Sequence, residues 1–83
     1  MTEHNHYVYV ISCSDDTLYT GYTKDSIQNR VEQHNSGNAA KYTRWRTPVE
    51  LVYSESYTTK SAAMSREYEI KQLTRNQKEE LIH

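Results

Sequence analysis

Two short runs of β-branched and aromatic residues near the N-terminus constrain the fold of this chain most strongly. Residues 6–12 and 18–22 have the composition of β-strands, and the polar cluster over residues 13–17 is typical of a turn. Because the connection between the runs is short, we expect the two strands to pair as an antiparallel hairpin. The chain is therefore predicted to begin with two adjacent strands of a sheet.

Hydrophobic periodicity and helix-capping residues predict the elements that follow the hairpin. In chain order they are a helix over 26–35, a loop or short helical turn over 39–46, a strand over 49–57, a helix over 60–73 and a short helix over 76–82. Asp25 or Ser26 is expected to cap the first helix, and Leu81 and Ile82 to pack back on the body. The order β-β-α-β-α-α describes one small mixed α/β (α+β) domain over residues 1–83, with a three-stranded antiparallel sheet flanked by helices.

The chain has 83 residues and one cysteine, which excludes an intramolecular disulfide. No Cys/His cluster has the spacing of a structural zinc site. We therefore expect packing alone to hold the fold, with a thin stability margin, and Cys13 to be a buried core or strand-end residue. The sequence shows neither a secretory signal nor an apolar run that approaches a membrane span, so the chain is expected to be soluble and cytoplasmic.

The net charge of −1 conceals a segregation of charge along the chain. Residues 24–46 carry five basic and two acidic side chains, and residues 60–78 carry the same numbers, so each segment has a balance of +3. If the fold brings the two segments together, they form one positive face of the kind that binds a phosphate backbone. Two separate solvated helix faces explain the charge equally well.

One carboxylate interrupts an apolar helix face. In the helix over 60–73, Ala63, Met64 and Ile70 define much of the apolar arc at about 100° per residue, and Glu67 falls between them. An ionised carboxylate is costly to bury without a cation beside it. That cation is either Lys71, one turn later, in a structural ion pair, or a metal ion. Both alternatives stay open on the sequence.

The strands also gather tyrosines. The chain has eight tyrosines and no phenylalanine, and strand alternation places Tyr7 and Tyr9 on one face. A phenol, with an unperturbed pKa of roughly 10, becomes a base only where a cation or another base stabilises its ionised form. Arg30, one turn from His34 on the first predicted helix, can supply such a cation if it meets the tyrosines. Otherwise Arg30 is a solvated side chain and the tyrosines are core rings.

Taken together, these residues resemble the GIY-YIG nuclease superfamily, which is named after two strand motifs that each contain a tyrosine. The motifs stand here as Tyr7-Val8-Tyr9 and Tyr19-Thr20-Gly21, with Tyr9 and Tyr19 ten residues apart. Further matches follow in order: Arg30, His34 one turn later, and Glu67 on a later helix. Longer segments resemble the small stand-alone bacterial branch with a UvrC-like catalytic module: Tyr19-Thr-Gly-Tyr-Thr23, His34-Asn-Ser-Gly37, Lys41-Tyr-Thr-Arg44 and Arg66-Glu-Tyr-Glu-Ile-Lys71.

This resemblance implies an endonuclease that hydrolyses phosphodiester bonds in DNA rather than RNA, single-stranded or branched DNA included, in repair, recombination or processing. It implies that Glu67 ligates one divalent ion, Mg²⁺ or alternatively Mn²⁺, which stabilises the leaving oxygen. Tyr19 is then the general base, helped by Tyr9 with His34 beside them. Arg30 binds the scissile phosphate.

Three positions depart from the family pattern. Tyr7 replaces the first glycine of the motif and Thr20 replaces the usual isoleucine, and neither exchange removes a group with an assigned chemical role. Tyr22 replaces the lysine of UvrC-like modules, which argues against a lysine-assisted mechanism. Every other group that the family uses is present.

The remaining candidates are residues expected to contact nucleic acid: Tyr22, Lys41, Tyr42, Arg44, Trp45, Arg46 and Lys71. The segment 41–46 is aromatic and basic, which suits the stacking of unpaired bases. The main alternative to a nuclease is a non-catalytic binding module that uses the same basic segments and stacks bases on Tyr42 and Trp45. A second alternative is a subunit that docks on a larger repair protein through Leu81 and Ile82.

Overall fold

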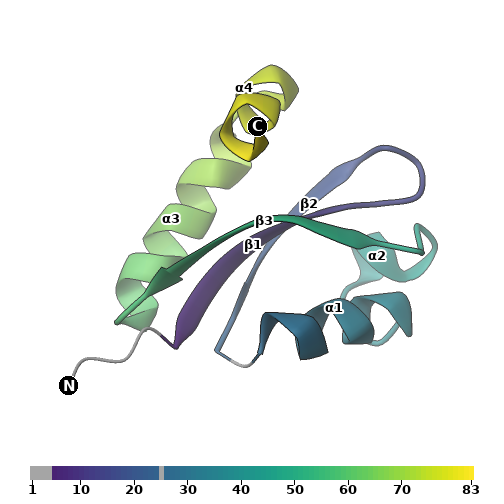
Figure 1. The fold of residues 1–83 in the computed structure, drawn as a ribbon, viewed down its shortest axis with the longest axis horizontal. Coiled ribbons are helices and arrows are strands. Elements are labelled where there is room, and N and C mark those ends of the chain that lie inside the picture. The colour runs from purple at the N-terminus through teal and green to yellow at the C-terminus, as the bar shows by residue number, and fades with distance from the viewer. Residues whose placement is uncertain (1–4, 25) are drawn as a thin grey trace.

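The computed structural model describes residues 5–24 and 26–83. Its elements, in chain order, are β1 (His6–Ser12), β2 (Leu18–Thr23), α1 (Ile27–Asn35), α2 (Lys41–Arg44), β3 (Glu50–Tyr57), α3 (Lys60–Gln72) and α4 (Arg75–Ile82) (Figure 1). The predicted mixed α/β fold with a three-stranded antiparallel sheet is confirmed. The segment predicted as a loop or short helical turn contains the short helix α2. Among the described residues, no helix has both the length and the apolarity that crossing a membrane requires.

The sheet has the strand order β2-β1-β3, so β1 is the central strand and pairs antiparallel with both neighbours. The β1–β2 pairing is the predicted hairpin, in which Tyr9 lies opposite Gly21. Alternation along β1 sends Val8 and Val10 to one face of the sheet and Tyr9 to the other. The central strand therefore supplies both faces with buried side chains.

Each face of the sheet has its own core, and α1 and α3 cover opposite faces (Figure 1). On the α3 face, the buried cluster consists of Val8, Val10, Ala63 and Ile70. On the α1 face, it consists of Tyr9, Ile11, Cys13 and Val49, with Ile27 and Val31 packed against it. Cys13 is buried as predicted, and burial raises the pKa of its thiol, which suits a packing role.

The structure tests three predictions about the helices. Met64 is 41% exposed, so the apolar arc of α3 is narrower than the helix wheel predicted. Leu81 and Ile82 pack against the α3-face cluster, as predicted. Both side chains are partly buried there, so part of the apolar surface on which the docking alternative relied is covered. Ser26 caps α1 by accepting a hydrogen bond from the Asn29 amide, whereas Asp25 lies outside the described residues.

A partly buried carboxylate, that of Glu55, ties β3 to α3. Glu55 accepts hydrogen bonds from the hydroxyls of Tyr53 and Tyr57, and the Arg66 Nε lies 3.0 Å from its Oε1. Burial alone raises the pKa of Glu55, but the hydrogen bonds from Arg66 and the two tyrosines outweigh it, so the pKa lies below its ordinary value. These four side chains fix α3 across the sheet and hold its Ala63–Ile70 stripe against the core.

One buried hydroxyl on the α3 face lacks a hydrogen-bond partner within the part of the chain that the structure describes. Thr20 is 3% exposed, and its Oγ1 is unpaired opposite Val10 of the central strand. Thr20→Val replaces that hydroxyl by a methyl group of similar shape. We expect the free energy of unfolding to rise by about 1 kcal/mol, because an unsatisfied buried group is removed. Urea denaturation measures this, and unchanged or lower stability would show that the hydroxyl is satisfied in solution.

Candidate active site

Tyr9 stands at the centre of the candidate site. It comes from the middle of the central strand, is 1% exposed, and directs its ring across β2 over Gly21. A Cβ atom on Gly21 would lie 2.5 Å from Cζ of Tyr9 and closer still to its hydroxyl oxygen. Real Cβ atoms do not approach other atoms so closely, so only glycine leaves room for the ring here. The glycine of the Tyr19-Thr20-Gly21 motif thus has a packing cause.

A chain of hydrogen bonds runs from Tyr9 through α1 into α2. Arg30 Nε donates to the Tyr9 hydroxyl at 3.4 Å, and that hydroxyl lies 2.8 Å from His34 Nε2. On the other side of the ring, His34 Nδ1 lies 2.7 Å from Thr43 Oγ1, whose hydroxyl donates to the Ala40 carbonyl at 3.2 Å. His34 and Thr43 are fully buried. One helical turn separates Arg30 from His34, which lets α1 present both to the same phenol.

The electrostatics of this chain leave a protonated phenol beside a neutral imidazole. Burial, helped by the positive charge of Arg30, lowers the pKa of His34 to about 4. Burial also raises the pKa of Tyr9, with Arg30 acting in the opposite direction and the charges of Tyr19 and Glu67 adding to the rise. At neutral pH, His34 is therefore uncharged and free to accept a proton through one ring nitrogen.

Tyr19 joins the site through its ring. It meets His34 edge-on at 5.2 Å between ring centroids and stacks on Tyr42 at 5.6 Å. The Arg46 guanidinium carbon in turn lies 4.2 Å from the Tyr42 centroid, and Arg46 is held by an ion pair to Asp15. The ring of Tyr42 is thus engaged by two neighbours, which leaves it poorly placed to stack a base. The expectation of base stacking on Tyr42 therefore lacks support from this geometry.

Glu67 comes from a helix that packs on the face of the sheet opposite to α1. It belongs to α3, between the buried Ala63 and Ile70, whereas Arg30 and His34 belong to α1 on the opposite face of the sheet. That all five side chains converge on one site therefore stays a prediction, although their helices pack on opposite faces of the sheet. A helix wheel fixes the direction of a side chain about its helix axis, not the side of the sheet on which the helix packs.

The Glu67 side chain is only slightly exposed and pairs with a lysine of its own helix. Its side chain is 13% exposed, and its Oε2 lies 3.6 Å from Lys71 Nζ, so the ion pair weighed from the sequence is present. Burial is the main cause of the raised pKa of Tyr9, and the negative charge of Glu67 adds slightly to it. No cluster of three or more His, Cys, Asp or Glu side chains suited to a metal occurs over residues 5–24 and 26–83.

The residues expected to contact nucleic acid divide into two groups. Lys41, Arg44 and Trp45 are exposed on and just after α2, and Trp45 is 86% exposed. Tyr22 and Lys71 lie on the α3 side, where Tyr22 packs against the core and its hydroxyl pairs with His6 Nδ1 at 2.9 Å. The helices of the two basic segments cover opposite faces of the sheet, so they do not merge into one positive face.

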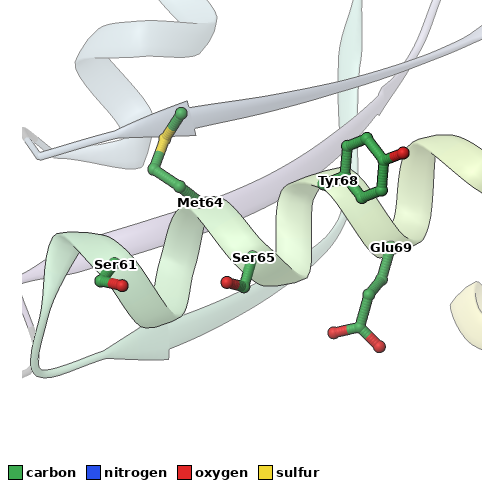
Figure 2. Close-up of a pocket in the computed structure, with 5 residues that line it drawn as sticks. All are labelled: Ser61, Met64, Ser65, Tyr68 and Glu69. Carbon is green, nitrogen blue, oxygen red and sulfur yellow. The ribbon is translucent and has the colours of Figure 1, made fainter.

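Thr43 was not among the residues that the sequence predicted for the site, although it lies within the family-like segment Lys41-Tyr-Thr-Arg44. A threonine in a short polar helix carries no signal of its own, since its partner His34 is nine residues away along the chain. A hollow lies away from this site, on the outer side of α3. It has a volume of about 550 Å³ and is lined by five side chains of that helix (Figure 2): Ser61, Met64, Ser65, Tyr68 and Glu69.

The contact between Tyr9 and Gly21 predicts a strong penalty for a side chain at Gly21. Gly21→Ala should lower the free energy of unfolding by roughly 1–3 kcal/mol, because the new methyl group and the ring cannot share the space. In a Tyr9→Leu background, the same change should cost much less, since the outer ring atoms are gone. Urea denaturation of the four proteins measures the coupling. Equal costs in both backgrounds would contradict this close-packing account.

This chain is similar to known proteins along most of its length. The model of the GIY-YIG catalytic domain matches residues 5–80. A UPF0213 protein of Natronomonas pharaonis is 60% identical over 78 residues, which are 94% of this chain and 91% of that protein. A UPF0213 protein of Staphylococcus epidermidis is 60% identical over 77 residues, which are 93% of each chain.

Two solution NMR structures are similar in fold as well as in sequence. The UPF0213 protein BH0048 of Bacillus halodurans superposes with a TM-score of 0.60 at 47% identity, over 93% of this chain and 81% of that one. The protein EF2693 of E. faecalis superposes with a TM-score of 0.63 at 41% identity, over 98% of this chain and 85% of that one. With a family match from residue 5 to residue 80 and relatives that align along nearly their whole length, the chain belongs to the GIY-YIG family, a family of nuclease domains.

Proposed function

We propose that this protein is a metal-dependent endonuclease that hydrolyses phosphodiester bonds in DNA. The observation that carries the proposal is the Tyr9 hydroxyl, held between the Arg30 guanidinium and a neutral, buried His34. Packing alone does not call for this arrangement, because three polar groups lose hydration there. A phenol beside a cation and an unprotonated imidazole is, in contrast, a device for moving a proton.

The geometry favours Tyr9 over Tyr19 as the group that removes the proton of the attacking water. The Tyr9 hydroxyl has a defined acceptor in His34 Nε2, whereas the contacts of Tyr19 with His34 and Tyr42 involve its ring. This reverses the order of the two tyrosines that the family resemblance implied. Tyr19 then packs the imidazole in place, and its ring separates His34 from solvent on the Tyr42 side.

Arg30 has a second part in the proposal, which is to bind the scissile phosphate. Its bond to Tyr9 is long, at 3.4 Å, and its guanidinium also donates to Gln33 Oε1 at 2.8 Å at the exposed end. A phosphate is a stronger partner for a guanidinium than a neutral phenol is. As Arg30 turns toward the phosphate, it uncovers the Tyr9 hydroxyl, which is otherwise closed to water.

Glu67 fits the single protein ligand of a hard divalent cation, Mg²⁺ in the first place and Mn²⁺ in the second. Such an ion commonly takes one or two carboxylates and completes its shell with water and substrate phosphates. The carboxylate is largely buried, its counter-ion Lys71 is half-exposed and displaceable, and its field reaches Tyr9. When bound, the ion supplies stabilisation of the charge that develops on the leaving oxygen.

The exposed surface beside α2 supports a single-stranded or frayed DNA substrate. Thr43 anchors α2 to His34, and the exposed Lys41, Arg44 and Trp45 lie on this helix or directly after it. A ring that is mostly exposed offers a face to an unpaired base, and the basic side chains suit the adjoining phosphates. We place the enzyme in the cytoplasm, in DNA repair, recombination or processing.

A binding module that does not cut would use the same surface, and the Glu67–Lys71 ion pair is the observation in its favour. A cleavage panel separates the two functions. Labelled single-stranded, duplex, flap and four-way DNA are incubated with Mg²⁺, Mn²⁺ or EDTA. The nuclease is expected to cut only with metal present. Binding without cutting under every condition would establish the binding module instead.

Exchange of Glu67 tests its proposed role as metal ligand. Glu67→Gln should reduce cleavage roughly a hundredfold or more, because stabilisation of the leaving oxygen is lost, while DNA binding through Arg30 remains within a few-fold. Lys71→Met is the matched control, since it breaks the same ion pair and leaves the carboxylate in place. It should cut at close to the wild-type rate. If both variants cut normally but unfold more readily, the pair is structural.

Exchange of Trp45 tests the proposed substrate. Trp45→Ala should weaken binding of single-stranded DNA by roughly 1–3 kcal/mol and affect duplex binding far less, because the loss is one base stack. Arg44→Ala is the control: it should weaken both substrates alike and lower the dependence of log affinity on log salt by about one phosphate contact. Fluorescence anisotropy over a salt series measures both. A salt-independent affinity, or faster cutting of duplex than of the matching single strand, would contradict this picture.

A further inference from the structure

Thr43 links the site to the backbone of α2. It is fully buried, its Oγ1 lies 2.7 Å from His34 Nδ1, and its hydroxyl donates to the carbonyl of Ala40, three residues earlier. Thr43 is thus closed to solvent and meets the proposed site at the far side of the imidazole ring. Its effect on the reaction is therefore expected to pass through His34.

The directions of the hydrogen bonds follow from a count of hydrogens. A threonine hydroxyl has one hydrogen, so both contacts of Thr43 are hydrogen bonds only if that hydrogen points to the Ala40 carbonyl and the oxygen accepts from His34. Nδ1 of His34 must then carry the ring hydrogen. A neutral imidazole carries one N–H, which leaves Nε2 as an acceptor for the Tyr9 hydroxyl. Arg30 Nε, which can only donate, completes a chain in which every bond runs the same way.

We propose that Thr43 is a positioning residue that fixes His34 in the tautomer protonated on Nδ1 and so aims the Tyr9 hydroxyl proton at Nε2. The inference rests on the proposed nuclease function. In the reaction, the attacking water gives a proton to the Tyr9 oxygen as the original Tyr9 proton moves to His34 Nε2. The hydroxide forms a bond to phosphorus, the bond to the leaving oxygen breaks, and that oxygen takes a proton from solvent. The imidazolium then releases its extra proton to solvent.

The opposite tautomer would stop this transfer. With a hydrogen already on Nε2, His34 could not accept a proton from Tyr9, and Nδ1 would need a donor that Thr43 has committed to Ala40. The correct tautomer is therefore stabilised by a side chain that never meets the substrate. Thr43→Val removes this hydroxyl and should alter the site without altering the shape of the core, because valine fills nearly the same volume as threonine.

Nitrogen NMR of the full chain tests the tautomer directly. Long-range ¹H–¹⁵N correlation spectra should show the His34 hydrogen on Nδ1 in the wild type and in Thr43→Ser, which keeps the hydroxyl. Thr43→Val should lose this preference. Thr20→Val is the matched control, because it makes the same exchange at a buried threonine on the other face of the sheet and should leave the His34 signals unchanged. A wild-type His34 with its hydrogen on Nε2 would overturn the inference, even if Thr43→Val failed to fold.

Cleavage kinetics test whether the tautomer matters to the reaction. Thr43→Val should lower kcat by at least about tenfold with little change in KM, as loss of a histidine-orienting partner does elsewhere, and Thr43→Ser should restore most of the rate. A Thr43→Val protein with an altered tautomer and an unaltered kcat would refute the positioning role. If the wild type cuts no DNA at all, the proposed nuclease function fails, and the spectra still decide whether Thr43 sets the tautomer.

Discussion

The close approach of the Tyr9 ring to Gly21 is the contact on which the rest of the site depends. It lets a side chain from the central strand cross over β2 without meeting another side chain, so the phenol oxygen can reach α1. The roles proposed for Arg30 and His34 depend on the Tyr9 hydroxyl, which lies between them. With a bulkier residue in place of Gly21, the Tyr9 ring could not take this position, and both α1 side chains would lose their shared partner.

The two faces of the sheet differ in the side chains that they bury. The α3 face holds most of the aliphatic core and the Glu55 cluster, which fixes the helix in place. The interior of the α1 face also contains polar groups, since His34 and Thr43 are fully buried there. Polar interiors stabilise less than aliphatic ones, so the α3 face carries most of the stability of a small domain. Glu67 is the exception, a carboxylate placed in the aliphatic layer.

Local patterns predicted the strands, the hairpin and the main helices, because turn residues, caps and periodicity act over a few neighbouring positions. Residue spacing also predicted that Glu67 points inward from α3, since rotation about a helix axis follows from spacing alone. Spacing does not determine how much of Met64 is covered by neighbouring elements or on which face of the sheet α3 packs. It also missed Thr43, whose importance arises only when α2 folds against His34. Tertiary placement decided each of these.

The alternation of side chains along β1 links folding to chemistry. Val8 and Val10 complete one core while Tyr9, between them, enters the other. A slip of this strand by one residue would turn the valines toward α1 and Tyr9 toward α3, and both cores would fail at once. The strand register that forms the two cores is therefore also the register that brings the Tyr9 hydroxyl to Arg30 and His34. Correct folding of the sheet and correct assembly of the site follow from the same strand pairing.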